Sequence, residues 1–139
     1  MDGYPYAAAI TVRFAETDAQ GVTHHSNYPV WFEIARVEYM RAFTGGYNLL
    51  RQRGVEILVT EMGVRYVAPA QFDDVVQVGA RCRELRGARF RFEYEVRRGD
   101  ELLADGWTAH ATVDAKTLRP TRVPAWLAEA VERAEAGSG

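Results

Sequence analysis

The sequence predicts an α+β fold in which a curved antiparallel β-sheet wraps around one long central α-helix. Residues 27–43 have a helical pattern that is apolar around most of its circumference, which is typical of a helix covered on more than one side. The segments that follow alternate apolar and polar residues with a period of two, as strands do. The connections between these segments are short, and short connections favour antiparallel pairing.

Length and composition indicate one ordinary globular domain. The chain has 139 residues, with 17 Lys and Arg against 19 Asp and Glu and a formal net charge of -2. We expect a single domain over residues 1–136 and a disordered tail at 137–139. The balanced charge argues against nucleic acid as a partner, and no apolar run is long enough for a membrane span. Because the first residues also lack the layout of a signal peptide, we expect a cytoplasmic protein.

The first strand is predicted by the alternation of Ile10, Val12 and Phe14 with polar residues. Periodicity then breaks over residues 16–26, which indicates a loop. This loop holds Asp18, Gly21, His24, His25 and Ser26. Because binding and catalytic side chains concentrate on loops that a rigid scaffold positions, we expect the functional site here.

The long helix is expected to begin at Asn27, whose side chain could cap it by accepting a hydrogen bond from an unpaired N–H. Pro29 suits the first turn, and Gly45–Gly46 ends the helix. One apolar face consists of Tyr28, Trp31, Phe32, Ala35, Tyr39, Ala42 and Phe43, and a second of Val30, Ile34 and Val37. A narrow polar stripe remains, on which Glu33 and Arg36 are spaced to form an ion pair.

About four strands are predicted after the helix. They are residues 57–60 with 62–68, then 76–82, then 90–96, and a last long strand that follows a hairpin turn at Arg98-Gly99-Asp100. In the last strand, Thr108, His110 and Thr112 share one side, and His110 is expected to point outward as a surface residue. Residues 124–135 are predicted to form a short terminal helix.

Several catalytic classes lack their residues in this chain. Neither serine stands in the Gly-x-Ser-x-Gly setting of serine hydrolases, and no glycine-rich phosphate loop is present. Cys82, the only cysteine, falls on the apolar register of a strand, which favours a small buried side chain over a nucleophile. A metal site on Asp18, His24 and His25 is disfavoured, because adjacent histidines rarely face one ion.

A carboxylate just before a helix start is the chemistry that remains. Gly21 permits a chain reversal that returns Asp18 toward the helix N-terminus, whose first N–H groups, from about His25, lack internal acceptors. Such groups can bind an oxygen that becomes negative, and a carboxylate beside them suits hydrolysis of an activated acyl group. On spacing alone, Asp18 is also explained as an Asx-turn residue.

These residues carry a resemblance to a known family. The stretch from Phe14 to Val22, followed by His25, Asn27-Tyr28, Trp31-Phe32-Glu33, Ala35-Arg36 and Glu38, closely resembles the hotdog-fold acyl-CoA thioesterases. It is most similar to the 4-hydroxybenzoyl-CoA thioesterase family, including its Tol-Pal-associated members. The likeness continues through residues 66–74 and 119–124, so it spans nearly the whole chain.

The resemblance implies hydrolysis of an acyl-CoA thioester with no metal or redox cofactor. It implies that Asp18 is the catalytic carboxylate, as nucleophile or as base for water, and that His25 assists. Further residues with implied roles are the amides of His25 and Ser26 as carbonyl-polarising donors and Gly21, Tyr28 and Glu33 as substrate contacts. Arg86 and Arg89 are implied CoA contacts, because a guanidinium matches phosphate oxygens. The family also implies a site between subunits, in a homodimer or homotetramer.

Two alternatives stay open at this point. A non-catalytic module that binds or senses acyl-CoA or acyl-carrier protein would use the same groove without needing Asp18. A hydratase or dehydratase of the same fold typically needs a histidine paired with a carboxylate on the helix, whereas His25 precedes the helix. His25-Ser26 stands where Tyr-Pro is common in the 4-hydroxybenzoyl-CoA enzymes, which indicates the aliphatic branch. The sequence assigns neither the acyl chain nor a role for His24.

Overall fold

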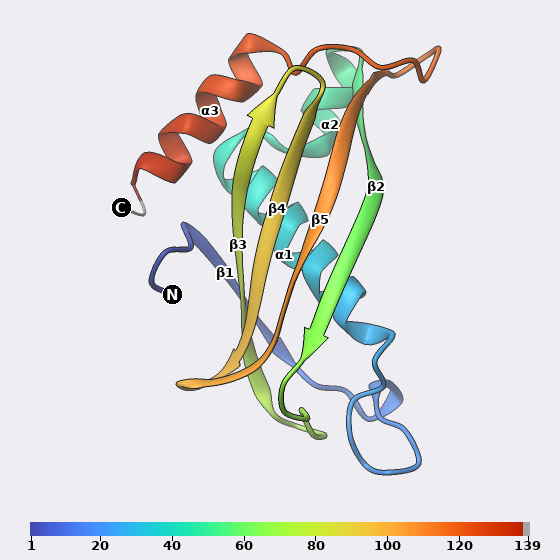
Figure 1. The fold of residues 1–139 in the computed structure, drawn as a ribbon, viewed down its shortest axis with the longest axis vertical. Coiled ribbons are helices and arrows are strands. Elements are labelled where there is room, and N and C mark those ends of the chain that lie inside the picture. Colours follow the sequence, from blue (N-terminus) through green and yellow to red (C-terminus); the bar gives the residue numbers. More distant parts are fainter. Residues whose placement is uncertain (138–139) are drawn as a thin grey trace.

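The computed structural model describes residues 1–137, which form one antiparallel five-stranded sheet with three helices (Figure 1). The elements are β1 (Tyr6–Thr11), a 3₁₀ turn (Phe14–Glu16), α1 (Asn27–Phe43), α2 (Gly46–Gln52), β2 (Val55–Tyr66), β3 (Val75–Arg86), β4 (Arg89–Arg98), β5 (Glu101–Asp114) and α3 (Ala125–Ala136). The predicted α+β class with an antiparallel sheet is confirmed. Gly137 caps the C-terminus of α3, and residues 138–139 of the predicted tail lie outside the described residues.

The strand order is β1-β3-β4-β5-β2, so β1 and β2 form the two edges of the sheet. β2 is a single long strand and not the two segments predicted from the sequence. Its register with β5 shifts between Val59 and Glu61, which leaves Thr60 as an extra residue. An extra residue of this kind bends a strand without ending it, and the bend explains the break in alternation seen in the sequence.

The first strand is shorter than predicted at its C-terminal end. β1 stops at Thr11, because Val12 exchanges backbone hydrogen bonds with Asp73 and Asp74, in the turn before β3. Val12 is buried as expected, but Phe14 lies in the 3₁₀ turn with 75% of its surface exposed. The prediction that Phe14 continues the strand is therefore wrong.

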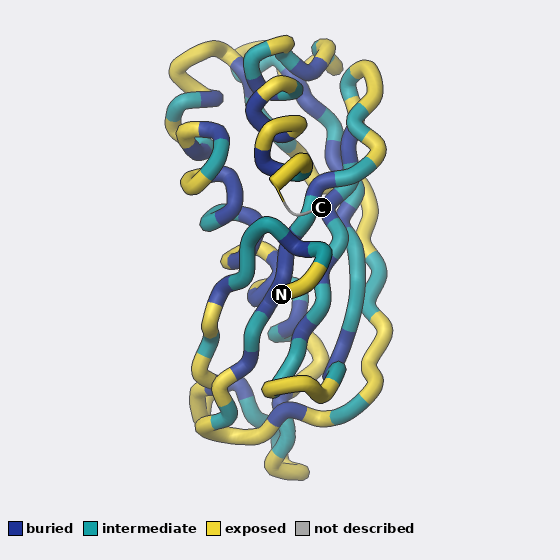
Figure 2. Tube along the Cα trace, turned by 90° about the vertical axis from the view of Figure 1, so that its left-hand side faces the viewer, coloured by how far each residue is buried: buried dark blue, intermediate teal, exposed yellow. Residues whose placement is uncertain are grey.

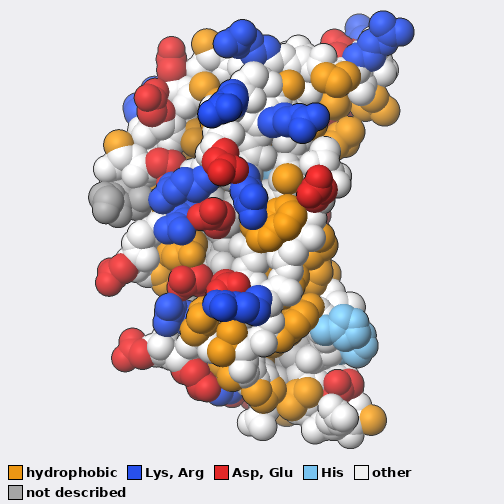
Figure 3. All heavy atoms as spheres, viewed as in Figure 1, with side chains coloured by type: hydrophobic (Ala, Val, Ile, Leu, Met, Phe, Trp, Pro, Cys, Tyr) orange, Lys and Arg blue, Asp and Glu red, His pale blue; other side chains and the backbone are white. Residues whose placement is uncertain are grey.

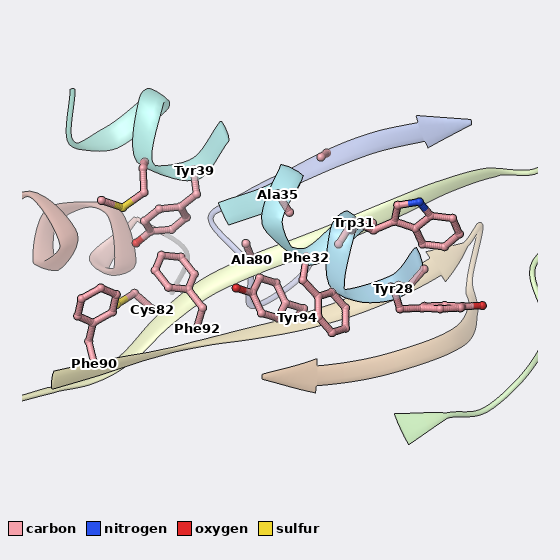
Figure 4. Close-up of a cluster of buried hydrophobic side chains, with 14 of the residues drawn as sticks. Tyr28, Trp31, Phe32, Ala35, Tyr39, Ala80, Cys82, Phe90, Phe92 and Tyr94 are labelled. Atoms are coloured by element: carbon pink, nitrogen blue, oxygen red, sulfur yellow. The ribbon is translucent and has the colours of Figure 1, made fainter. Parts of the chain in front are cut away.

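One face of α1 forms the core against the sheet, as the sequence predicts. Its buried side chains are Tyr28, Trp31, Phe32, Ala35, Arg36, Tyr39 and Met40 (Figure 4). Phe32 stacks on Tyr94 of β4, with ring centroids 4.4 Å apart. Gly106 of β5 permits this contact, since a Cβ there would lie 2.6 Å from the Phe32 ring. Ala42 was assigned to the same face but is exposed near the end of the helix.

The second apolar face of α1 stays exposed in the single chain. Val30 is 45% exposed and Ile34 is 36% exposed. Figure 2 shows that buried and exposed residues alternate along the helices. The sheet of one chain therefore covers only one side of a helix whose sequence predicts cover on more than one.

A polar chain of hydrogen bonds crosses the interior between α1 and the sheet. Arg36 donates from Nε to the Tyr47 hydroxyl and from Nη1 to the Tyr94 hydroxyl, at 3.0 Å each. The Tyr94 hydroxyl meets Thr108 Oγ1 at 2.6 Å, and Thr108 Oγ1 meets His110 Nε2 at 2.7 Å. Each side chain of this network thus finds at least one partner, which offsets part of the cost of removing it from water, while His110 Nδ1 has no partner among the described residues.

These buried hydrogen bonds show that two predictions are wrong. His110 is 1% exposed and points inward, because the polar side of β5 faces Tyr94 and not solvent. Arg36 makes no ion pair with Glu33 among the described residues, since its guanidinium turns inward to the two tyrosines. One of those tyrosines, Tyr47, comes from α2, a short helix that the sequence did not predict.

The terminal helix α3 covers the part of β3 that β1 does not reach. Its Glu135 accepts hydrogen bonds from the Tyr39 hydroxyl at 2.6 Å, the Cys82 backbone N–H at 2.9 Å and Arg83 Nη1 at 2.6 Å. Cys82 is buried beneath it, and burial raises the pKa of its thiol to about 12. The prediction of a small buried side chain at Cys82 is confirmed. Among the described helices, none is both long and apolar enough to cross a membrane.

Candidate active site

Asp18 lies in a tight turn of the loop between β1 and α1, and Figure 1 shows this loop at the lower end of the molecule. Its Oδ1 accepts a hydrogen bond from the Gln20 N–H at 2.8 Å, and its backbone carbonyl accepts one from Gly21 N–H at 3.0 Å. Gly21 has a φ of 80°, a conformation that glycine adopts at little cost. The Asx turn and the chain reversal are therefore both present, as the residues predict.

A cleft of about 310 Å³ opens beside this turn. The loop contributes Asp18, Thr23 and His25, and α1 contributes Tyr28. The end of β2 and the segment after it supply the opposite wall, with Tyr66 followed by residues 67–69. The structure thus brings Asp18, His25 and Tyr28 together from the predicted site, and it adds Tyr66.

The start of α1 is held differently from the prediction. Asn27 does not cap the helix by accepting a hydrogen bond; its Nδ2 donates to the carbonyls of Glu16 at 3.0 Å and His24 at 3.2 Å. The Ser26 N–H donates to Nδ1 of His24 at 3.2 Å. Within residues 1–137, no acceptor engages the N–H of His25. Of the two amides expected to face a carbonyl oxygen, His25's is therefore available and Ser26's is engaged.

Tyr66 closes the cleft from the side of β2. Its hydroxyl donates to the backbone carbonyl of His25 at 2.9 Å. Its ring makes edge-to-face contacts with Tyr28, at 5.0 Å between centroids, and with His25, at 6.4 Å. Tyr66 has no role assigned from the sequence, where it marks only the end of a strand and the first residue of the stretch 66–74 that resembles the thioesterases.

Glu16 is a second residue without a predicted role. It is only 4% exposed, and its carboxylate accepts from the Trp31 Nε1–H at 3.0 Å and from the Arg13 N–H at 2.9 Å. Burial raises the pKa of Glu16, but the hydrogen bonds outweigh burial, so the pKa lies below its usual value. Glu16 therefore stays ionised and fastens the loop to α1. No short-range pattern reveals this, since Trp31 lies 15 residues further along the chain.

Four predicted contacts do not line the cleft in the single chain. Gly21 shapes the turn of Asp18 but is not among the lining residues. Glu33 is exposed on α1 and is not among the residues that line the cleft. Arg86 and Arg89 are paired across the β3–β4 turn, at the opposite end of the sheet from Asp18 (Figure 1). Within one chain the structure does not bring these arginines to the carboxylate.

Further cations lie at the end that holds Arg86 and Arg89. The Val123 N–H donates to the Gly87 carbonyl, and the Ala115 N–H donates to the Gly54 carbonyl. The segment between β5 and α3 therefore meets the β3–β4 turn and the turn before β2 at this end. We call this region the basic end; its cations are Arg53, Arg86, Arg89, Lys116, Arg119 and Arg122. Figure 3 shows Lys and Arg side chains over this upper end and histidine near the lower end.

No group of three or more His, Cys, Asp and Glu side chains among the described residues is arranged to hold a metal ion.

Comparison with known proteins decides the family. The sequence profile of the thioesterase-like superfamily matches residues 12–131, which is most of the chain. The chain belongs to the thioesterase-like superfamily. The match begins just after β1 and ends within α3, so it includes the loop of Asp18, the whole of α1 and the strands β2 to β5.

Members of the superfamily resemble this chain over most of its length. A putative esterase of Aquifex aeolicus is 38% identical over 78% of this chain and 85% of its own length. The acyl-CoA thioesterase YbgC of Haemophilus influenzae is 31% identical, over 86% of this chain and 88% of its own. A thioesterase of Thermus thermophilus, solved in complex with coenzyme A and Zn, superposes with a TM-score of 0.85 at 26% identity, over 98% of both chains. These likenesses confirm the hotdog thioesterase fold.

Proposed function

We propose that the protein hydrolyses acyl-CoA thioesters to a free acid and CoA. The observation that carries this proposal is that Asp18 and His25 line the same cleft and that the backbone N–H of His25 has no acceptor among the described residues. Membership of the superfamily and the name of the Haemophilus influenzae relative support the same reaction. The proposed reaction needs water and neither a metal ion nor a redox cofactor.

In the proposed mechanism, the thioester carbonyl oxygen accepts a hydrogen bond from the His25 N–H. Asp18 either takes a proton from the attacking water or attacks the carbonyl carbon itself. The C–S bond then breaks, and the thiolate of CoA takes up a proton from the His25 ring, which lies in the same cleft. When water is the nucleophile, the proton held by Asp18 then replaces the one that the ring gave up. When Asp18 is the nucleophile, water hydrolyses the resulting mixed anhydride, which frees the acid and restores the carboxylate and the proton of the ring. A positioned donor of this kind lowers the barrier by roughly 3–4 kcal/mol, because it binds the oxygen most strongly when the oxygen is negative.

We further propose that the active unit is a homodimer formed along β2. This edge strand exposes the apolar side chains of Leu58, Val59 and Met62. The helix α1, whose Tyr28 contacts Tyr66 at the end of β2, exposes Val30 and Ile34. A second copy paired with β2 in the antiparallel sense would cover both surfaces. The long helix would then be enclosed by two sheets, as its two apolar faces predict, and two dimers could combine into the predicted homotetramer.

The dimer gives Arg86 and Arg89 a role. β2 runs from the basic end to the cleft, so antiparallel pairing lays the basic end of one subunit beside the cleft of the other. The CoA phosphates would meet these two arginines from the partner subunit while the thioester lies at Asp18. Glu33, exposed on α1, would likewise contact substrate only in the assembled dimer. The single buried cysteine suits a reducing, cytoplasmic location.

Asp18→Asn tests the proposed reaction. Asparagine keeps the acceptor that the Gln20 N–H uses, so the turn is expected to stay folded. Free-thiol release is measured with hexanoyl-, palmitoyl- and benzoyl-CoA, and we expect Asp18→Asn to lower kcat by orders of magnitude. Equal activity in the variant would contradict the mechanism. Tight binding of acyl-CoA with no turnover by the wild type would favour the sensing module instead.

A further inference from the structure

The peptide between His24 and His25 is held from one side only. Its carbonyl, that of His24, accepts hydrogen bonds from the Asn27 N–H at 3.1 Å and from Asn27 Nδ2 at 3.2 Å. No cis peptide occurs among residues 1–137, so the N–H of His25 points opposite to that carbonyl. Since the carbonyl points at Asn27, the N–H points away from the helix start.

The side chain of Asn27 has no freedom to turn. Both N–H groups of its Nδ2 donate hydrogen bonds, one to the His24 carbonyl and one to the Glu16 carbonyl. The Glu16 carbonyl also accepts a hydrogen bond from the His24 N–H at 2.8 Å. The same oxygen therefore joins the 3₁₀ turn both to the end of the loop and to the start of α1. Glu16 is itself fixed by the bond from Trp31 to its buried carboxylate. Asn27 therefore links the catalytic loop to the body of α1.

The neighbouring backbone amide, that of Ser26, is already bonded to the side chain of His24. Its Nδ1 accepts from the Ser26 N–H and lies 2.8 Å from Ser26 Oγ. This leaves one backbone donor, that of His25, for a substrate oxygen at this point of the cleft. The orientation of a single peptide thus decides whether the start of α1 offers the cleft a backbone donor.

We propose that Asn27 is a positioning residue that aims the His25 N–H into the cleft, with the buried side chain of Glu16, bonded to Trp31, as its support. The catalytic consequence rests on the proposed thioesterase function. The structural part, that Asn27 orders the peptide of His24 and His25, holds in the free protein and has its own test.

The first test measures order without substrate. In ¹⁵N-labelled protein, the heteronuclear NOE of the His25 amide is compared between the wild type, Asn27→Ala and Asn48→Ala. Asn48 is the only other asparagine and is exposed on α2, so it serves as the matched control. We expect the NOE to fall in Asn27→Ala and to stay unchanged in Asn48→Ala. An unchanged NOE in Asn27→Ala overturns the proposal. If Asn27→Ala does not fold, Asn27→Ser, which retains one donor, is measured in its place and is expected to show a partial fall.

The second test measures hydrolysis of the best substrate among the three acyl-CoAs. An oxyanion donor acts mainly in the transition state, so Asn27→Ala is expected to lower kcat about 10- to 100-fold with KM nearly unchanged. A rise in KM with kcat unchanged would show a role in substrate binding only, which overturns the proposal. If the wild type hydrolyses none of the acyl-CoAs, the proposed function fails, while the NOE still decides whether Asn27 orders the peptide.

Glu16→Gln separates support from direct catalysis. Glutamine offers only one oxygen, so it loses the bond to Trp31 or the bond to Arg13 but leaves the Glu16 backbone carbonyl in place. We expect a smaller fall in kcat than in Asn27→Ala and an unchanged pH dependence of kcat/KM. A loss as large as that of Asp18→Asn would make Glu16 a catalytic base and overturn its role as a support.

Discussion

Trp31 donates its indole N–H to the carboxylate of Glu16 at 3.0 Å, and both side chains are buried. This bond joins the 3₁₀ turn, which precedes the loop of Asp18, to the first turns of α1. An ionised carboxylate in such a place is costly unless each oxygen has a donor, so the bond should matter for stability.

Trp31→Phe is therefore expected to lower the free energy of unfolding by about 1–3 kcal/mol, because the Glu16 oxygen is left without its buried donor. Urea denaturation measures the change. Trp126→Phe on α3 is the control, since the Trp126 indole N–H makes no hydrogen bond among the described residues and meets Arg53 through its ring face. Equal losses in the two variants would mean that ring volume, and not the hydrogen bond, sets the effect.

The buried His110 predicts a pH-dependent stability. Burial and then the charge of Arg36 lower the pKa of His110 to about 3, from 6.5. Between these two pH values His110 is protonated in the unfolded chain but neutral in the folded chain. The free energy of unfolding therefore falls as the pH drops from about 6.5 toward 3. The slope is at most about 1.4 kcal/mol per pH unit. His110→Gln should remove this contribution and flatten the curve of unfolding free energy against pH, whereas His24→Gln, at an exposed site, should leave it intact. Parallel curves for wild type and His110→Gln would contradict the prediction.

The proposed β2 interface is testable with a single charge. Val59→Lys places an ammonium on the exposed edge strand, where it should block pairing of two copies. We expect sedimentation velocity to show a monomer and thiol release to fall with it. Val75→Lys provides the matched control, because Val75 is 54% exposed against 51% for Val59 but pairs with Thr11 within the chain. A Val59→Lys variant that remains a dimer would place the interface elsewhere.

Mixed dimers test whether one subunit supplies the arginines for the other's cleft. Asp18→Asn and the double variant Arg86→Ala/Arg89→Ala are each expected to hydrolyse acyl-CoA poorly. Refolded together, they should form dimers in which one cleft has an intact Asp18 and an intact pair of arginines from the partner. We expect activity to return in the mixture. No recovery, despite mixed dimers seen by native mass spectrometry, would mean that the arginines do not act across the interface.

The sequence predicted the features that depend on neighbouring residues. Asp18 and Gly21 define a turn by local chemistry, and the spacing of Tyr28, Trp31 and Phe32 identifies the buried face of α1. The antiparallel sheet followed from alternation and short turns. For such features, every residue that decides the outcome lies within about one turn or one strand.

The errors have a common physical cause. His110 looked like a surface residue because its neighbours Thr108 and Thr112 are polar, yet its ring stacks on Phe90 of the adjacent strand β4. Its Nε2 meets Thr108 Oγ1, which in turn bonds the Tyr94 hydroxyl. A buried polar group is decided by what faces it, and alternation along one strand contains no information about that. The same reason hid the roles of Glu16 and Asn27. Each has one partner within three residues, but the Glu16 carboxylate also needs Trp31, 15 residues away, and Asn27 also needs the Glu16 carbonyl, 11 residues away.

Glu135 has a consequence for the order of folding. It accepts the Cys82 backbone N–H and the Tyr39 hydroxyl, so the edge of β3 and the end of α1 gain their last hydrogen bonds from a residue 53 and 96 positions further along the chain. On the ribosome, the sheet and the long helix can be synthesised and collapse while this corner is still open to water. The nascent chain should therefore keep β3 accessible, to chaperones or to another nascent copy, until residue 135 has left the exit tunnel.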